Sequence, residues 1–327
     1  MALLNPAVTL PSGSRDALEQ WDERYIGASQ LVTPETWVSQ LGDETEVASL
    51  ETKYPMTMLA IKYIEAISDD PNFDSSGEKF VDLVVAQYKA GISETLLNLI
   101  TNVFKARDWF ASAERFAQAE AIFKLKLISA DLEANTETCG WDDLALFHDS
   151  HLANPKGDTS ITFDNLQSTP KDCADLANIE AELTLMAQVK DVNGDRGFVS
   201  GNVLGVPPEK FRKMTNLLKQ DFVPTAAGTA TMRNPYNDAS LTVVQMSQLT
   251  DANDWFIFDT NLIAKGVPPW IVAKLNIPAP GFDALSLRRH DETSEMFRTT
   301  GKIGVDSRIF YGRKFLFPHA VRKVLGA

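Results

Sequence analysis

The segment from Leu99 to Ala134 limits the possible folds more than any other part of the chain. Neither glycine nor proline interrupts it, and apolar side chains recur at spacings of three and four residues in two stripes. The first stripe is Phe110, Ala113, Ala117, Ala121, Leu125, Ile128 and Leu132, and the second is Phe116, Ala119, Phe123, Leu127, Ala130 and Ala134. Glu120 precedes Lys124 by four residues, an order that favours an ion pair. The pattern predicts one helix of roughly thirty residues, about 45 Å long, that is covered on two sides.

The residues before this helix have the composition of β structure. Residues 78–90, EKFVDLVVAQYKA, are bracketed by Gly77 and Gly91. Alternation places two sets of side chains on opposite faces, Phe80, Asp82, Val84 and Ala86 on one and Val81, Leu83, Val85 and Gln87 on the other. This predicts a two-stranded loop that protrudes from the body of the protein.

The rest of the chain mixes helices and strands. After a turn-rich loop we expect a helix with Leu176, Ile179, Leu183 and Met186 on one face, then a short strand that leads into a helix near Pro208. Strands are expected in SLTVVQMSQL, DWFIFDT and PWIVAKL, and again at 295–305 and 307–310. Because no regular βαβ rhythm is present, the expected fold class is α+β.

The N-terminal fifty residues are punctuated by proline and glycine, at Pro6, Pro11, Gly13, Gly27, Pro34 and Gly42. Only short amphipathic pieces lie between these breaks, such as the stretch from Asp16 to Tyr25. The pattern predicts an extended arm with one or two short helices, and not a packed domain.

Charge is distributed unevenly. The net charge of −13 argues against a protein that holds duplex DNA or an anionic membrane through a general positive field. Residues 1–51 carry a net charge of −7, whereas residues 285–327 carry +5. Two interpretations stay open: two independently solvated surfaces, or an acidic head that meets a basic tail, within one chain or between neighbours.

Cysteine content and hydropathy indicate the compartment. Cys139 and Cys173 are too few for a disulfide framework and suit a reducing environment. The first residues lack a basic region, and Pro6 and Pro11 break their apolar stretch, so we expect no signal peptide. No run approaches eighteen apolar residues, so no segment is expected to span a membrane. We therefore expect a soluble protein of the cytoplasm, or of something assembled there.

Few residues suggest chemistry. His148 and His151, with Asp149 between them, could hold a metal if both imidazoles shared a helical face, but Pro155 soon after favours a loop. Residues 191–197, DVNGDRG, fail as a calcium loop because Arg196 stands where glycine is required. Residues 299–302, TTGK, lack the upstream glycine of a phosphate loop. We assign no catalytic, cofactor or metal residue from the sequence.

The order of these parts is the most informative feature. An arm, a hairpin loop, a long helix, a turn-rich loop, a mixed domain and a basic β-rich tail follow one another. This order resembles the tailed-bacteriophage major capsid proteins of the Hong Kong 97 fold, and in detail the Mu-type major head subunit. The resemblance covers roughly residues 75–325 and is carried by VAQYKAGISETLL, ERFAQAEAIFKLKLISADLEAN, DDLALFHDSHLANPKGD, VLGVPPEKFRKMTNLL, RNPYND and DWFIFDT.

The resemblance implies a division of the chain and a function. It implies an N-terminal arm at 1–52, an extended loop at 53–97, a spine helix and peripheral domain at 98–175, an axial domain at 176–283, and a return to the peripheral domain at 284–327. Hexamers and pentamers would close into an icosahedral shell around packaged double-stranded DNA, without catalysis, cofactor or sequence-specific DNA binding. Such a protein would belong to the virion and would assemble in the host cytoplasm.

The resemblance also implies partners. We expect a separate scaffolding protein, because the arm is too short to carry a scaffolding segment, and a portal protein; a decoration protein is possible. The acidic arm of one subunit is expected to lie along the basic tail of its neighbour. The candidate contacts between subunits are Asp16, Glu19, Glu44, Glu46, Lys79, Lys89, Arg288, Arg289 and Arg298.

Two alternatives remain at this stage. One is an encapsulin-like compartment, which shares the architecture but encloses enzyme cargo. The other, from a different class, is a metal-dependent hydrolase that uses His148 and His151.

Overall fold

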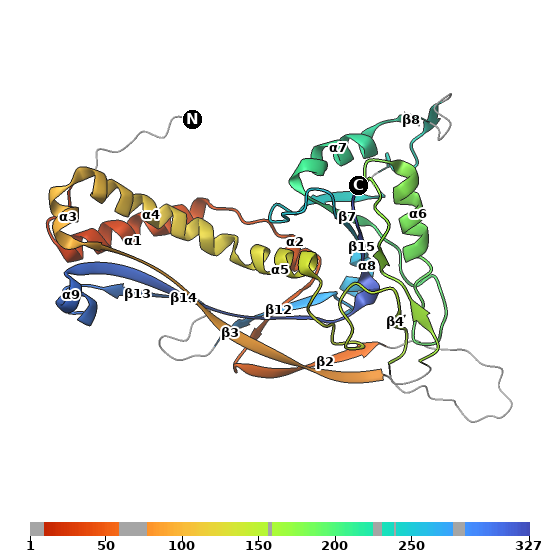
Figure 1. Ribbon diagram of the computed structural model, residues 1–327, viewed down its shortest axis with the longest axis horizontal. Helices are drawn as coiled ribbons and strands as arrows, with labels where there is room; N and C mark the ends of the chain where they lie inside the picture. The colour runs from red at the N-terminus through yellow and green to blue at the C-terminus, as the bar shows by residue number, and fades with distance from the viewer. Residues whose placement is uncertain (1–9, 59–76, 156–158, 225–230, 239, 277–284) are drawn as a thin grey trace.

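The computed structural model describes residues 10–58, 77–155, 159–224, 231–238, 240–276 and 285–327. An elongated part and a second, mixed part lie side by side (Figure 1). The helices are α1 (Ser14–Leu31), α2 (Trp37–Gln40), α3 (Leu96–Thr101), α4 (Val103–Ala121), α5 (Phe123–Ala134), α6 (Leu176–Met186), α7 (Pro208–Lys219), α8 (Thr260–Ala264) and α9 (Glu295–Thr300), with a 3-10 turn at Pro318–Ala320. Within these residues, no helix combines the length and the apolar character that a membrane span requires.

A six-stranded sheet runs below the helices of the elongated part (Figure 1). Its order is β1 (Asp43–Val47), β12 (Trp270–Leu275), β14 (Lys302–Phe315), β3 (Gly77–Thr95) and β2 (Glu51–Met58), and β13 (Leu285–His290) also pairs with β14. Only β1 and β12 are parallel. The predicted two-stranded loop is confirmed as β2 and β3, which pair from Glu51 with Val84 to Met58 with Gly77. Residues 59–76 of this loop lie outside the described residues, as do residues 1–9 of the predicted arm.

The second part contains a five-stranded sheet. Its order is β10 (Thr242–Gln245), β7 (Val203–Val206), β11 (Trp255–Phe258), β15 (Val321–Val324) and β6 (Leu166–Gln167). Two short pairs, β4 (His151–Leu152) with β5 (Thr162–Phe163) and β8 (Phe222–Pro224) with β9 (Thr231–Arg233), complete the strands. The predictions of α6, of a strand leading into α7, and of strands β10, β11 and β12 are confirmed.

The N-terminal arm is more ordered than the sequence suggested. Instead of short pieces, residues 14–31 form one helix, α1, which packs along α4. Four side chains at helical spacing are buried there, and they face Trp109, Phe110 and Phe116 of α4: Ala17, Leu18, Trp21 and Tyr25. The expectation of an unpacked arm is therefore wrong for α1, because its apolar stripe completes the cover of α4.

The predicted single long helix is divided into α3, α4 and α5. At the first break, Asn102 accepts hydrogen bonds from the N–H groups of Phe104 and Lys105 and thereby caps α4. At the second, Ile122 lies in a turn between α4 and α5. The expected Glu120–Lys124 ion pair is not formed, since Glu120 bonds to Tyr25 and Ser307, and Lys124 Nζ lies 2.9 Å from a Glu44 oxygen. Tertiary partners on three different elements, α1, β14 and β1, replace the local pair.

The apolar stripes are buried in two separate cores. In the first stripe, residues up to Ala117 lie in a core shared with α1, and residues from Leu125 onward lie in the main core. The second stripe is only partly covered, and Ala119, Ala130 and Ala134 are exposed.

One predicted strand is a helix. Residues 295–300 form α9, whereas β structure was expected from Glu295 to Val305. Ser294 accepts a hydrogen bond from the N–H of Phe297 at the start of α9, and Gly301 ends it with φ of 67°. Both ends are thus capped, which overrides the alternating pattern.

Candidate functional site

The hairpin of β2 and β3 presents an apolar outer face. Val81, Leu83 and Val85 point into the core and are buried, as the alternation predicts. On the opposite face Phe80 is 60% exposed and Val84 is 58% exposed. Asp82 lies between them on the same face and is also exposed.

The hairpin is held in place at its base. Lys79 Nζ lies 2.9 Å from an Asp143 oxygen and donates to the carbonyl of Trp141. Gly140 allows close contact here, because a Cβ atom at this position would lie 2.5 Å from Val81 Cγ2. The outer face is therefore carried on a supported strand.

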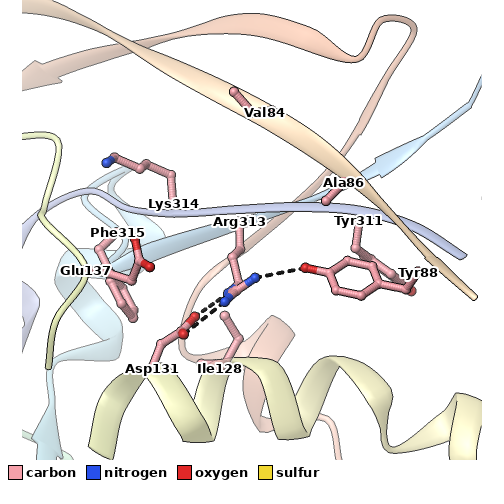
Figure 2. A pocket seen from close by; sticks show the side chains of 10 residues that line it. All are labelled: Val84, Ala86, Tyr88, Ile128, Asp131, Glu137, Tyr311, Arg313, Lys314 and Phe315. Carbon is pink, nitrogen blue, oxygen red and sulfur yellow. Dashed lines mark hydrogen bonds and ion pairs between the residues drawn. The ribbon is translucent and has the colours of Figure 1, made fainter. Parts of the chain in front are cut away.

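An ion pair fastens α5 to the sheet. Figure 2 shows Arg313 of β14 pointing toward Asp131 of α5, with Tyr88 of β3 on its other side. Arg313 donates two hydrogen bonds to the Asp131 carboxylate, one of them 2.9 Å from Nη2 to Oδ1, and Nη1 donates to the Tyr88 hydroxyl at 3.1 Å. The hydrogen bonds and charge of Asp131 raise the pKa of Arg313. This bidentate geometry sets the orientation of the helix on the sheet.

The end of α5 is fastened to the second part. Lys323 of β15 donates to the carbonyl groups of Leu132 and Glu133 at 3.2 Å, and its Nζ lies 3.0 Å from an Asp254 oxygen. The Glu133 carboxylate in turn accepts hydrogen bonds from the N–H groups of Thr250 and Asp251. A cation at the last turn also complements the helix dipole. The elongated part and the second part are thus joined at one helix end.

A buried charge network holds the C-terminal strand. Arg322 and Glu182 are almost fully buried, and Arg322 Nε lies 2.6 Å from Glu182 Oε2. Lys171 bonds to the other Glu182 oxygen, and Arg322 Nη1 donates to the carbonyl of Asp164 at 2.8 Å. The network connects β15 with α6.

All four acidic candidate contact residues have partners in the same chain. Glu44 lies between Lys124 and Lys274, and Glu46 accepts a hydrogen bond from Asn276. Asp16 accepts hydrogen bonds from Ser12 and Gln20, and exposed Glu19 pairs with Arg15. In the described structure, these four carboxylates are therefore engaged in ion pairs or hydrogen bonds within their own chain.

The candidate basic residues differ among themselves. Arg289 Nε lies 2.6 Å from an Asp22 oxygen of α1, so head and tail meet within the chain at this point. Lys79 pairs with Asp143, as described above. Lys89, Arg288 and Arg298 are exposed and form no ion pair with the described residues. No ion pair within the described residues neutralises the charges of these three side chains.

The histidine motif does not form the metal pair that the sequence offered. His148 lies in a loop with its side chain 39% exposed, whereas His151 is fully buried, and their ring centroids are 5.9 Å apart. His151 instead meets Asp142 at 2.8 Å, and Cys139 also bonds to Asp142. Burial alone would raise the pKa of Asp142, but hydrogen bonds from His151, Cys139 and the N–H of Leu152 hold it at about 2. Residues 191–197 form a turn.

His319 makes the stability of the subunit depend on pH. It lies fully buried among Trp141, Phe163 and Phe198, and burial together with the charge of His151 lowers its pKa to about 3, against the opposing charge of Asp142. Between about pH 6.5 and 3 the unfolded chain therefore binds a proton that the folded chain does not. We expect acidification from about pH 7.5 to 5.0 to reduce the free energy of unfolding by about 2 kcal/mol through this residue.

The measurement is urea unfolding of the wild type and of His319→Phe at both pH values. Carboxylates contribute equally to the two proteins, so the difference between their pH dependences reports His319. An equal loss of stability in both proteins would contradict the expectation.

Sequence reasoning missed several of these residues. Cys139 and Asp142 stand three apart in a turn-forming stretch, which is a local signal that could have linked them to His151. Asp131 and Arg313, or Glu182 and Arg322, are separated by more than a hundred residues and carry no local signal.

Comparisons with known proteins relate this chain to a protein family and to several solved structures. A family model described as "Phage capsid protein" matches residues 90–324. The fold is similar to a solved structure from Microbacterium phage Oxtober96, with a TM-score of 0.52 and 9% identity over 90% of this chain and 93% of that chain. A structure from Mycobacterium phage Bobi has a TM-score of 0.51 and 12% identity, over 90% and 91%. The procapsid of bacteriophage JBD30 has a TM-score of 0.49 and 12% identity, over 96% and 75%. None of the curated proteins is a match.

Proposed function

Because this chain belongs to the phage capsid protein family, we propose that it is the major head subunit of a tailed phage. In this role it closes as hexamers and pentamers into an icosahedral shell around packaged double-stranded DNA. The α+β architecture is of the Hong Kong 97 type, and the chain is a structural capsid protein. The Mu-type assignment, like assembly in the host cytoplasm, is part of the proposal.

One observation carries the proposal furthest. The apolar outer face of Phe80 and Val84 lies on a hairpin that is supported from below by Lys79 and by the close packing at Gly140. In a shell, a neighbouring subunit would bury these side chains, and their apolar area would stabilise the contact. Repeated over a closed shell, contacts of modest affinity become a stable assembly.

We keep the predicted division of the chain as part of the proposal. It consists of an N-terminal arm at 1–52, an extended loop at 53–97, a spine helix and peripheral domain at 98–175, an axial domain at 176–283, and a return to the peripheral domain at 284–327. Strand β12 of the fourth segment pairs in the sheet of the elongated part, and β15 of the last pairs with β11. Partners of the proposal are a separate scaffolding protein and a portal protein, and a decoration protein fits the same scheme. No catalytic step is part of it.

The test is electron microscopy of the purified full chain, alone and with a candidate scaffolding protein. Regular shells or capsomer rings are expected, and a persistent monomer under all conditions would contradict the proposal.

An encapsulin-like compartment is the second candidate, because it shares the architecture. Enzyme cargo in place of DNA inside particles from infected cells would favour it. A metal-dependent hydrolase centred on His148 and His151 is not proposed, since the two side chains face different environments.

The expected contact between the acidic arm of one subunit and the basic tail of its neighbour can be tested with the arginines of the tail that are unpaired within the described residues. Arg289 is left unchanged in this test, because it already pairs with Asp22 of its own chain. We expect Arg288→Glu with Arg298→Glu to lower shell yield several-fold, because each exposed pair contributes only about 0–1 kcal/mol but recurs in every subunit. Shell yield by sedimentation and secondary structure by circular dichroism are the measurements.

Asp195→Lys with Asp238→Lys, at two exposed sites outside residues 285–327, is the control that also changes the charge by four. If the Arg288→Glu, Arg298→Glu variant gave the same shell yield as the wild type, these two arginines would be excluded from the interface.

A further inference from the structure

A buried cluster of three side chains is left unused by the proposed assembly function. Cys139, Asp142 and His151 each offer one ligand atom, and these atoms lie within 4.8 Å of one another. Cys139 and His151 are fully buried. Thiolate, carboxylate and imidazole are the ligands that zinc-class cations select in proteins.

The orientation of His151 is fixed from behind. Its Nε2 atom lies 3.0 Å from the backbone oxygen of Leu146, and a carbonyl oxygen can only accept, so Nε2–H is the donor. The other ring nitrogen, Nδ1, then faces Asp142 Oδ2 at 2.8 Å. Both of these atoms are acceptors unless a proton or a cation lies between them. A histidine that donates one N–H to a backbone carbonyl and offers the other nitrogen is the arrangement that metal-binding histidines adopt.

Cys139 meets the same carboxylate from the other side. Its Sγ atom lies 2.9 Å from Asp142 Oδ1. The turn that brings them together is defined by hydrogen bonds from Cys139 N to the Leu144 oxygen and from Asp143 N to the Cys139 oxygen. Asp143 has φ of 64° in this turn. The backbone therefore presents both ligands without rearrangement of the turn.

The charge of the cluster does not change when a divalent cation enters. Without a metal, the cluster holds the thiol proton, the Nε2 proton and a proton between Nδ1 and Oδ2, and its net charge is zero. With a divalent cation, it consists of a thiolate, a carboxylate, a neutral imidazole and the cation, again with a net charge of zero. Two protons leave to solvent, one from Sγ and one from Nδ1, and no redox partner is required. Because no additional charge is buried, the large desolvation cost of an unpaired ion does not arise.

We propose that Cys139, Asp142 and His151 form a binding site for a thiophilic divalent cation of the zinc class. Typical ligand distances are about 2.3 Å for sulfur and about 2.0 Å for nitrogen and oxygen. To admit the ion, Sγ and Nδ1, which lie 2.9 and 2.8 Å from the Asp142 oxygens, would each move away from the carboxylate by roughly half an ångström. The site joins the turn at 139–142 to β4, and His148 is not a member of it. The bound ion would have three protein ligands and would hold the loop that follows α5 against β4.

The experiment uses the purified full chain, freed of metal with a chelator and then titrated with zinc and with cobalt. We expect one zinc per chain, two protons released per zinc, and the visible and charge-transfer bands of thiolate-bound cobalt. Loss of an outer partner already costs about 10–100-fold in metal affinity, so loss of a direct ligand in Cys139→Ser or His151→Gln should weaken zinc binding by more than that range. Cys173→Ser and His148→Gln are the matched controls, since both residues lie outside the cluster, and they should bind like the wild type.

Folding of the variants is checked without metal. Cys139→Ser should melt near the temperature of the metal-free wild type, whereas zinc should raise the melting temperature of the wild type only. Absence of stoichiometric zinc and of cobalt bands in the wild type would overturn the proposal, and protons would then hold the triad together. Equal zinc binding by Cys139→Ser would overturn it as well, because the ion would lie elsewhere. Shell formation is measured separately, so failure here leaves the capsid proposal untouched.

Discussion

Replacement of Phe80 and Val84 by threonine is expected to prevent shell formation while the subunit stays folded. Both side chains are more than half exposed on the outer face of β3, so the subunit loses little when they are removed. In a shell their burial is worth roughly 2 to 4 kcal/mol per contact, or about 30- to 1000-fold in association constant. Threonine retains the preference for a strand. Shell yield by sedimentation and electron microscopy is the measurement.

The control lies between the two residues. Asp82 shares the exposed face, and Asp82→Asn changes its chemistry without removing apolar surface. We expect this variant to assemble normally and both proteins to show the circular dichroism of the wild type. Normal shells from the Phe80→Thr, Val84→Thr double variant would exclude this face from the interface.

Glu182→Leu is expected to lower the free energy of unfolding by about 3 to 5 kcal/mol. The change leaves Arg322 buried without its close countercharge, and the remaining acid, Asp164, lies 3.5 Å from it and is partly exposed. Domains of this kind have only about 5–15 kcal/mol in total, so much of the stability of the second part would be lost. Urea unfolding followed by fluorescence is the measurement, because Trp255 lies in the adjacent strand β11.

The double variant Glu182→Leu, Arg322→Met separates charge from packing. Replacement of both partners by apolar side chains removes the unpaired charge, and such replacements are often neutral. We expect it to recover most of the lost stability. A double variant as unstable as Glu182→Leu alone would assign the effect to packing or to Lys171, which also bonds to Glu182.

Local patterns in the sequence were sufficient for most secondary structure. The alternation at 80–87 identified the buried face of β3, because strand geometry alone decides which side chains share a face. The stripe from Phe110 to Leu132 identified the core side of α4 and α5 for the same kind of reason. Pro208 marked the start of α7, since its missing N–H is harmless in the first turn.

Local patterns failed where a distant partner or a cap decided the conformation. Residues 295–300 alternate like a strand, but Ser294 and Gly301 cap a helix there. Asn102 ends α3 and starts α4, because its side chain satisfies free N–H groups of the following turn. The helix α1 was expected only as short pieces, because its stability comes from burial of Trp21 and Tyr25 against α4, which no local window contains.

The sequence by itself therefore determined the α+β class, the order of the elements and the buried faces, all of which depend on spacings of two to four residues. Only the tertiary structure decided which charges meet. In the folded chain, Arg289 pairs with Asp22, Glu44 with Lys124, and Asp131 with Arg313. The side chains grouped with His151 are Cys139 and Asp142, whereas the sequence suggested His148. These contacts join residues far apart in the chain, and their energy depends on burial and geometry, which exist only after the chain has folded.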